Sequence, residues 1–173
     1  MIRIIIGQNA SGKTLYLNNC INNDLEDSDT IDFVTNLKDA SYNDISYNQE
    51  RLQVLEEITD VEMIDTSNEL LALIGSPIKL SKDFLQIVTI LCKECKKVYL
   101  DEPEQGLSEY EINLLISFVQ YAESTYEEIV VVTHSELFVQ IPLCEIFTPK
   151  MDEVTSDIIL YEVEEDKKFE VID

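Results

Sequence analysis

Residues 2–14 read IRIIIGQNASGKT, an apolar run rich in β-branched residues followed by the pattern G-x-x-x-x-G-K-T. Residues 15–19 can continue as a helix, so the segment has the strand, loop and helix order that a P-loop requires. The two glycines allow successive backbone N–H groups to turn inward, and the helix start adds the positive end of its dipole. We therefore predict a socket for the phosphates of a nucleotide, formed by Gly7, Gln8, Asn9, Ala10, Ser11, Gly12, Lys13 and Thr14.

Two side chains at the end of this motif carry its chemistry. We expect the Lys13 ammonium to bridge the β- and γ-phosphates of ATP and the Thr14 hydroxyl to ligate Mg²⁺. The alternative interpretation is a glycine-containing turn with a surface lysine. The chain has only four glycines and two of them lie here, which favours the phosphate socket.

The composition indicates a single domain over residues 1–173. With 45% hydrophobic residues, a chain of 173 residues can bury a substantial core. No stretch approaches the ~20 apolar residues of a membrane span, and Gln8 and Asn9 interrupt the apolar start that a signal peptide would need. We therefore expect a cytoplasmic protein without membrane insertion, whose four cysteines are reduced.

The charge of the chain is strongly acidic. It has 12 Lys and Arg residues against 35 Asp and Glu residues, which gives a net charge of −23. Such a charge opposes approach to the phosphate backbone of a nucleic acid or to an anionic lipid surface. We therefore expect no autonomous nucleic-acid binding, and the charge favours a basic protein as partner.

The segment after the first helix predicts one strand and a small insertion. Residues 31–35 alternate between apolar and polar side chains, as a second parallel strand would. Residues 37–80 carry weaker signals, and we interpret them as a short helical insertion. Its helices are predicted over residues 49–58 and 67–74, the second being ended by a glycine.

A strongly apolar helix follows the insertion. Ser81 can N-cap this helix, which leads to Lys96 and Lys97, where positive charge suits the negative end of the helix dipole. Cys92 and Cys95 form a C-x-x-C pattern within the same apolar helix. Because there is no second pair, we interpret them as buried, reduced side chains rather than a metal or redox site.

Residues 98–103 read VYLDEP, an apolar strand that stops at two carboxylates. The C-terminal ends of parallel strands are where α/β sheets place their ligands, so we expect these carboxylates beside the P-loop. Asp101 can then hold the Mg²⁺ shell, and Glu102 can accept a proton from the attacking water or orient it. Ser108 and Glu111 have the spacing of a capping box at the start of a further helix.

The only histidine follows another apolar strand, over residues 128–133. A lone histidine is more often structural than catalytic, but the C-terminal end of a second such strand favours a functional role for His134. A fifth strand is predicted at residues 144–147. The chain is expected to end in a β-hairpin over about 157–173, flanking a charged run.

The segments GQNASGKT, VYLDEP, the GLS that follows, and VVVTHSE occur in the order and approximate spacing of ATP-binding-cassette (ABC) ATPases. From position 1 to about 140, the chain resembles small stand-alone members of that superfamily. These are related to transporter ATPase subunits, SMC-type ATPases and ATPases of bacterial defence operons. The resemblance implies an α/β P-loop NTPase fold, with a mainly parallel sheet flanked by helices. It also implies that the strand before His134 lies between the P-loop strand and the strand that ends at Asp101.

The resemblance assigns roles to individual residues. It implies Asp101 as the Walker B metal residue, Glu102 as the catalytic carboxylate and residues 106–108 as the D-loop. It implies His134 as the switch histidine that contacts the γ-phosphate. Asn36 lies where the family carries a glutamine that senses metal and water, and an ordinary loop asparagine is an equal alternative.

Three features depart from the family pattern. Only Met1 precedes the first strand, where the family carries an antiparallel layer with an aromatic residue for adenine, so we expect adenine to be held otherwise. Residues 80–86, LSKDFLQ, occupy the place of the L-S-G-G-Q signature. Ser81 could still donate to a phosphate from a helix start, whereas the Asp83 carboxylate would repel one. The insertion is also too short for SMC coiled-coil arms.

The resemblance implies an ATPase that binds and hydrolyses Mg-ATP. We expect it to act as a nucleotide-driven switch or clamp in a larger assembly of a transporter, DNA-processing or defence type, with another ATPase or a basic protein as partner. One alternative is a nucleotide-gated binding module with little turnover. Another is a small-molecule P-loop kinase, which the presence of only two arginines, Arg3 and Arg51, disfavours.

Overall fold

The computed structural model describes residues 1–27, 32–37, 42, 44–60, 62–66, 70–74, 80–164 and 167, and for 62–66 and 70–74 it describes the backbone alone. The elements in chain order are β1 (Ile2–Ile5), α1 (Lys13–Asp27), β2 (Phe33–Thr35), α2 (Gln49–Thr59), β3 (Glu62–Thr66), β4 (Leu70–Ile74), α3 (Lys82–Leu91), β5 (Lys97–Asp101), α4 (Glu109–Tyr121), β6 (Glu128–Val132), β7 (Glu145–Met151) and β8 (Ile158–Glu162). None of the helices in this described part is both long and apolar enough to cross a membrane.

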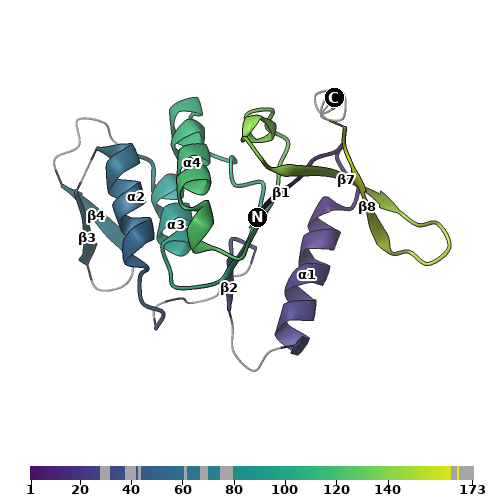
Figure 1. Cartoon of the computed structure of the whole chain (residues 1–173), viewed down its shortest axis with the longest axis horizontal. Helices are drawn as coiled ribbons and strands as arrows, with labels where there is room; N and C mark the ends of the chain where they lie inside the picture. Colours follow the sequence, from purple (N-terminus) through teal and green to yellow (C-terminus); the bar gives the residue numbers. More distant parts are fainter. Residues whose placement is uncertain are drawn as a thin grey trace.

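Six strands form one sheet in the order β2-β5-β6-β1-β7-β8 (Figure 1). All neighbours are parallel except β7 and β8. Strand β6 lies between β1 and β5, with Val131 opposite both Ile4 and Leu100. The structure therefore confirms the α/β P-loop fold with a mainly parallel sheet, and the predicted place of the strand that precedes His134.

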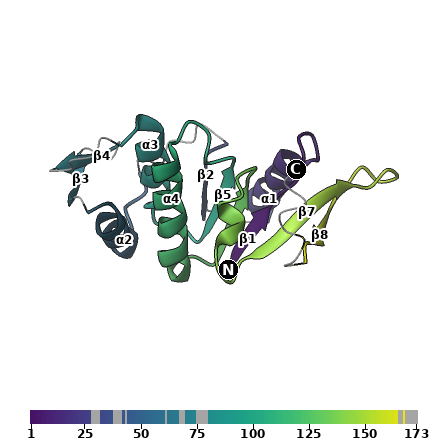
Figure 2. The same cartoon turned by 90° about the horizontal axis from the view of Figure 1, so that it is seen from above.

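Helices cover both faces of this sheet, α1 on one side and α3 and α4 on the other (Figure 2). Ile4 packs in the cluster that contains Phe84 of α3 and Phe118 of α4. The next residue, Ile5, packs instead with Leu17 of α1. Successive side chains of a strand point to opposite faces, so a strand covered on both sides needs apolar residues without alternation. This explains why the parallel strands read as continuous apolar runs.

The two predicted helix caps are present. The Ser81 side chain accepts a hydrogen bond from the backbone N–H of Phe84 at the start of α3. Ser108 and Glu111 form the predicted capping box at the start of α4. These caps fix where the two helices begin, α3 within the signature-like segment 80–86 and α4 directly after residues 106–108.

Helix α3 ends at Leu91, so the prediction that it leads to Lys96 and Lys97 is wrong. Lys97 is the first residue of β5, and its Nζ lies 2.7 Å from Asp24 Oδ1. Lys96 Nζ lies 3.2 Å from Asp32 Oδ2. Carboxylates of neighbouring elements are therefore the partners of these lysines, in place of a helix dipole.

The two cysteines of the C-x-x-C pattern lie at and beyond the end of this helix rather than inside it. Cys92 is the C-cap of α3, and both Cys92 and Cys95 are buried free thiols. Burial raises the pKa of Cys92 to about 12 and that of Cys95 to about 11. Thiols held in the neutral form are poor metal ligands and poor nucleophiles, which agrees with a packing role.

The insertion differs in part from the prediction. Helix α2 is present, but the predicted helix over 67–74 is wrong, because residues 70–74 form β4, which pairs antiparallel with β3. A short apolar run such as LLALI fits a strand as well as a helix, and only its pairing partner decides between the two. The insertion is thus a helix followed by a hairpin, packed outside α4 and α3 (Figure 2).

The structure shows a β-hairpin near the C-terminus that the sequence analysis did not predict. Strand β8 pairs antiparallel with β7, the longer form of the strand expected at 144–147. Residues 168–172, its predicted partner, lie outside the described residues. The turn between β7 and β8 has no glycine; instead Asp152 Oδ1 accepts hydrogen bonds from the backbone N–H groups of Val154 and Thr155. A carboxylate therefore makes a turn where the sequence shows no Asn-Gly or Asp-Gly signal.

Candidate functional site

The loop between β1 and α1 holds the predicted phosphate socket. Lys13 is the first residue of α1, so the unpaired N–H groups of the helix start lie in the motif. Ala10 and Gly12 have positive φ angles of 61° and 93°. A Cβ at Gly12 would also lie 2.7 Å from Ile158 Cδ1 of β8. Backbone conformation and the closeness of the hairpin both favour glycine at this position.

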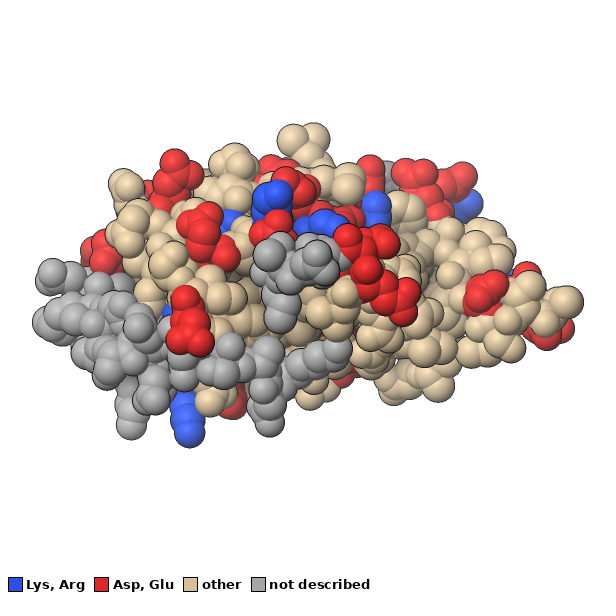
Figure 3. Space-filling view, turned by 90° about the horizontal axis from the view of Figure 1, so that it is seen from below, with Lys and Arg blue, Asp and Glu red and all other residues tan. Residues whose placement is uncertain are grey.

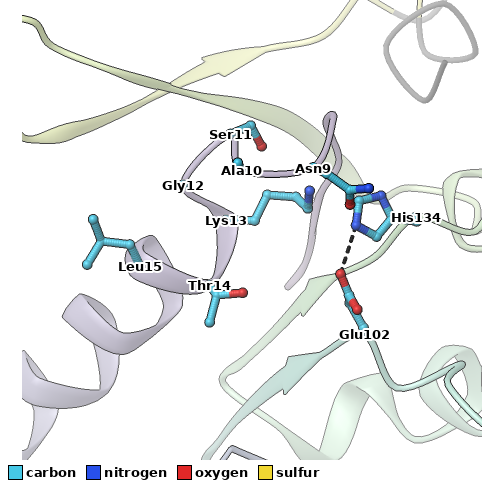
Figure 4. A pocket seen from close by; sticks show the side chains of 9 residues that line it. All are labelled: Asn9, Ala10, Ser11, Gly12, Lys13, Thr14, Leu15, Glu102 and His134. Carbon is cyan, nitrogen blue, oxygen red and sulfur yellow. Dashed lines mark ion pairs between the residues drawn. The ribbon is translucent and has the colours of Figure 1, made fainter.

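A pocket of about 230 Å³ opens at this loop (Figure 4). It is lined by the loop together with one side chain from the end of β5 and one from the end of β6, namely Asn9, Ala10, Ser11, Gly12, Lys13, Thr14, Leu15, Glu102 and His134. Leu15 was not selected from the sequence, because a helix residue after the motif carries no signal of its own. Gly7 and Gln8 do not line the pocket, and they contribute main-chain oxygens to its lysine.

Lys13 is buried at the centre of the loop, with 5% of its surface exposed. Its Nζ donates to the carbonyl oxygens of Gly7 at 2.8 Å and Gln8 at 2.9 Å. Burial lowers the pKa of Lys13, and the Glu102 carboxylate is the largest opposing influence. The ammonium is therefore held in the socket by main-chain oxygens.

Thr14 and Asp101 form the candidate metal pair. Thr14 Oγ1 donates to the Asp101 carboxylate, 3.0 Å from Oδ2 and 3.2 Å from Oδ1. Burial raises the pKa of Asp101, and the hydrogen bond from Thr14 opposes that shift. In the described part of the chain, no group of three or more His, Cys, Asp or Glu side chains could hold a metal by itself. One hydroxyl and one carboxylate fit Mg²⁺, which usually combines one or two protein oxygens with phosphates and water.

The side chains of Glu102 and His134 are in direct polar contact at the side of the pocket opposite the phosphate loop. His134 Nε2 lies 2.7 Å from Glu102 Oε1 (Figure 4), and the other carboxylate oxygen of Glu102 accepts from Gln105 Nε2. Glu102 has a φ of 45°, and its N–H donates to Val132 O at 2.7 Å. The sequence predicted both residues at this edge, and the structure adds the direct bond between them.

Glu104 is a site residue that the sequence reasoning did not select. Its Oε1 accepts hydrogen bonds from Thr133 Oγ1 at 2.6 Å and from the backbone N–H of His134 at 2.9 Å. A third carboxylate two residues after Glu102 was visible in the sequence. Its partners could not be found there, because they lie on the turn after β6.

Asn36 lies at the end of β2 and is bonded to the neighbouring strand. Its Nδ2 donates to Asp101 O and its Oδ1 accepts from Asp101 N, both at 2.8 Å. The amide thus fixes the backbone that carries the Asp101 carboxylate, and Asn36 does not line the pocket. A contact of Asn36 with metal or water stays a prediction.

Ser81 also lies outside the pocket, at the start of α3. Its backbone N–H donates to Glu111 Oε1 at 2.6 Å, and the backbone N–H of Ser108 donates to Glu111 Oε2 at 3.0 Å. Burial raises the pKa of Glu111, but the hydrogen bonds from Ser108 and Ser81 outweigh it and leave this pKa below its ordinary value. One buried carboxylate therefore joins the starts of α3 and α4, a link that the capping-box pattern alone did not reveal.

Two solved structures share this arrangement of elements. A protein assigned as a cobalt transport ATP-binding protein (cbiO-2) matches with a TM-score of 0.55 and 18% identity, over 85% of this chain and 64% of that one. A metal-chelate type ABC transporter in an inward-facing conformation matches with a TM-score of 0.52 and 17% identity, over 93% of this chain and 71% of that one. The chain thus spans less than two thirds of the first of these proteins.

No protein-family model and no curated protein sequence matches the chain. The likeness of the chain to known proteins therefore consists of the fold and the motifs at the ends of β1, β5 and β6. At 17–18% identity the structural likeness establishes the fold alone. The chain has the P-loop α/β fold of ABC-type ATP-binding proteins.

Proposed function

We propose that this chain binds Mg-ATP and hydrolyses its β–γ anhydride. The observation that carries the proposal is one pocket in which the phosphate loop faces the Glu102–His134 pair, bonded at 2.7 Å. A carboxylate and an imidazole opposite a phosphate socket are suited to placing a water for attack on a terminal phosphoryl group. The fold supports the same reading.

Nucleotide binding would begin with an exchange of partners at Lys13. Its Nζ would leave the carbonyl oxygens of Gly7 and Gln8, at 2.8 and 2.9 Å, for oxygens of the β- and γ-phosphates. Phosphate oxygens carry more negative charge than carbonyl oxygens, so the new hydrogen bonds are stronger. The N–H groups of the loop and of the start of α1 would bind the remaining phosphate oxygens.

Thr14 and Asp101 would hold the metal. When bound, Mg²⁺ supplies positive charge that neutralises the phosphoryl oxygens. Thr14 Oγ1 would turn from Asp101 toward the ion, and the Asp101 carboxylate would bind its hydration shell. Lys13 is the only Lys or Arg among the residues that line the described pocket, so we expect tight ATP binding to require a divalent cation.

Glu102 would act as the base. Its carboxylate would orient the attacking water and accept its proton, while Gln105 and His134 hold the two carboxylate oxygens in place. His134 Nε2 points toward Glu102 from the end of the neighbouring strand β6, and both side chains line the pocket (Figure 4). His134 would share its proton between Glu102 and a γ-phosphate oxygen as charge develops there.

We infer that hydrolysis drives a switch or clamp in a larger assembly of a transporter, DNA-processing or defence type. The partner would be another ATPase or a basic protein, because a net charge of −23 favours association with positive surfaces and opposes autonomous nucleic-acid binding. Figure 3 shows acidic side chains spread over one face of the molecule, with few basic ones among them. We also propose a cytoplasmic location and a single ATPase domain over residues 1–173.

A nucleotide-gated binding module with little turnover is the second candidate, and one observation favours it. Asp83 stands where the signature carries a glycine, and a Cβ at Gly106 would lie 2.8 Å from Asp83 Oδ2. The Asp83 carboxylate therefore lies against the D-loop of its own chain. A signature-like segment engaged in this way would contribute little to a second phosphate site.

The kinase alternative is weakened by the position of both arginines. Arg51 is fully buried and donates to the carbonyl oxygens of Cys95 and Thr125, each at 2.7 Å. Arg3 forms an ion pair with Glu128 at 3.0 Å. Neither guanidinium lines the pocket, so neither would stabilise a phosphoryl group in transfer.

ATP binding and phosphate release measured on one preparation distinguish the three functions. An ATPase releases phosphate with Mg²⁺ and without an added acceptor, and this is the result we expect. A gated module binds ATP without release, and a kinase releases ADP only when a small-molecule acceptor is added. Tight Mg-ATP binding without acceptor-independent release would therefore contradict the proposed hydrolysis.

A further inference from the structure

Glu104 connects the two turns that carry the proposed catalytic pair. It follows Glu102 on the turn after β5, where Gln105 N–H donates to Glu102 O at 3.1 Å. Its Oε1 accepts from Thr133 Oγ1 at 2.6 Å and from the backbone N–H of His134 at 2.9 Å, both on the turn after β6. A single carboxylate oxygen thus bonds to two donors of the opposite turn.

Two further bonds lie at the same junction. Glu102 N–H donates to Val132 O at 2.7 Å, and His134 Nε2 lies 2.7 Å from Glu102 Oε1. His134 is therefore held at both ends, its backbone by Glu104 and its imidazole by Glu102. Since both carboxylates belong to one tight turn, the backbone and the ring of His134 are fixed relative to the same short segment.

We propose that Glu104 is a positioning residue that fixes the backbone of His134 so that its imidazole meets Glu102. Hydrogen bonds to an ionised carboxylate are stronger than neutral ones, and Glu104 accepts two of them through one oxygen. A donor held in place before reaction needs no rearrangement as charge develops. The effect on turnover rests on the proposed ATPase function, whereas the placement of His134 is a property of the chain alone.

Glu104 has a second, electrostatic effect on the phosphate socket. Its charge raises the pKa of Lys13 against the larger effect of burial, and the same field opposes incoming phosphates. Its other oxygen, Oε2, is buried and has no hydrogen-bond partner among the described residues. The substitution Glu104→Gln therefore removes the charge and keeps an oxygen that can accept the two hydrogen bonds. The amide nitrogen would replace Oε2, which accepts no hydrogen bond from the described residues.

Three variants test the proposal: Glu104→Gln, Glu104→Ala and Glu104→Asp. Gln keeps the acceptor without the charge, Ala removes both, and Asp keeps the charge on a side chain too short to reach the same donors. Each is measured for phosphate release at saturating Mg-ATP and for ATP affinity. The imidazole Cε1–H NMR signal is also recorded without nucleotide, and it is unambiguous because the chain has one histidine.

We expect Glu104→Ala to lower kcat by about tenfold or more and to shift the His134 signal. Its ATP affinity should be no weaker than that of the parent protein, because a negative charge near the phosphates is gone. Glu104→Gln keeps a weaker acceptor, so it should lose clearly less kcat and shift the signal less than Ala or Asp, and it should bind ATP more tightly. Glu104→Asp should lose kcat and shift the signal as Ala does, and it decides the matter should the Ala variant fail to fold.

Two outcomes would overturn the role of Glu104. One is parent-like kcat and an unshifted His134 signal in the Ala and Asp variants. The other is an equal loss in Gln and Ala, which would make the charge rather than the acceptor the cause. A parent protein that releases no phosphate would instead contradict the proposed ATPase function, and the His134 signal would still decide whether Glu104 positions this residue.

Discussion

Helix α1 starts at the phosphate loop, and helix α3 starts at the signature-like segment. The polar groups at the first start face an open pocket, whereas those at the second contact other residues of the chain. At the phosphate loop, side chains from the ends of β5 and β6 converge with the loop on an open pocket. At the start of α3, Ser81 N–H is bonded to Glu111 and Asp83 lies against Gly106. The first helix start faces a cavity, whereas the second is engaged by its own chain.

This difference supports the proposal that the chain supplies the phosphate-loop half of a nucleotide site. A helix start binds phosphate through N–H groups that have no partner inside the protein. At the start of α3, the Ser81 N–H already donates to the buried Glu111 carboxylate. A second carboxylate, that of Asp83, also lies at this helix start. The proposed phosphate loop therefore lines an open pocket, whereas the signature-like segment contacts Gly106 and Glu111 of the same chain.

The largest effect is expected from a substitution in the phosphate loop. Lys13→Ala should lower ATP affinity by about 100-fold or more, because the only cation lining the described pocket is lost. Titration with a fluorescent ATP analogue measures this, with Lys150→Ala, an exposed lysine of β7, as the control. If the Lys13 variant binds ATP as tightly as the parent protein, the P-loop assignment is wrong.

The next effect, at His134 in the same pocket, distinguishes ATP hydrolysis from ATP binding. His134→Ala should lower phosphate release by about 100-fold and leave ATP affinity nearly unchanged, because Nε2 contacts Glu102 rather than the loop. Thermal unfolding of the variant is the control. A loss of folding stability as large as the loss of turnover would favour a structural role for this residue.

A smaller effect is expected from removing the charge of Glu111, which joins the starts of α3 and α4. Glu111→Gln should lower the free energy of unfolding by about 1–3 kcal/mol at pH 7, because a buried carboxylate that accepts from Ser81 and Ser108 becomes a weaker acceptor. Chemical denaturation measures it, with the exposed Glu109→Gln as the matched control in the same helix turn. Equal stability of both variants would remove Glu111 from its linking role.

The difference in folding stability between the parent protein and Glu111→Gln should depend on pH. The pKa of Glu111 is lowered in the folded state, so the unfolded chain takes up the proton first as pH falls. Its contribution to stability is therefore complete above the unfolded value of about 4.3 and is lost as pH falls through the folded pKa. The stability difference between the parent and Glu111→Gln should shrink over that window; a constant difference would contradict the assigned cause.

The smallest expected effect concerns pairing of two copies. We predict that the isolated chain is a poor ATP-driven homodimer, because Asp83 would add a negative charge near the γ-phosphate of a neighbour and acidic copies repel each other. Asp83→Gly should strengthen pairing by about tenfold at most, because Asp83 already lies against Gly106. Light scattering with and without Mg-ATP tests this. A stable parent homodimer that forms only with ATP would contradict the prediction.

Local signals in the sequence predicted the parts of the molecule that depend on neighbours in the chain. The phosphate loop, the cap at Ser81 and the capping box at Ser108 were all predicted and are present. The order of β1, β5 and β6 was predicted from the family resemblance and is confirmed. Strand ends bearing Asp101 and His134 were placed at one sheet edge for a general reason, since parallel strands end together.

Features that depend on tertiary partners could not be predicted in this way. The run at 70–74 became a strand because residues 62–66 pair with it, and β8 pairs with β7 through a turn made by Asp152. Glu104 looked like an ordinary acidic residue after a strand, and the sequence indicated only the capping box for Glu111. The donors to Glu104 lie on the turn after β6, and the second donor to Glu111 is Ser81 before α3. No periodicity or spacing could reveal these contacts.

The most direct test of the central claim uses Glu102→Gln. An amide has nearly the shape of the carboxylate but cannot take the proton of the attacking water, so Mg-ATP should remain bound while phosphate release falls by about 100- to 1,000-fold. Binding and single-turnover release are measured on the same sample beside the parent protein. Release at the parent rate would contradict the account, because Glu102 would then have no part in hydrolysis.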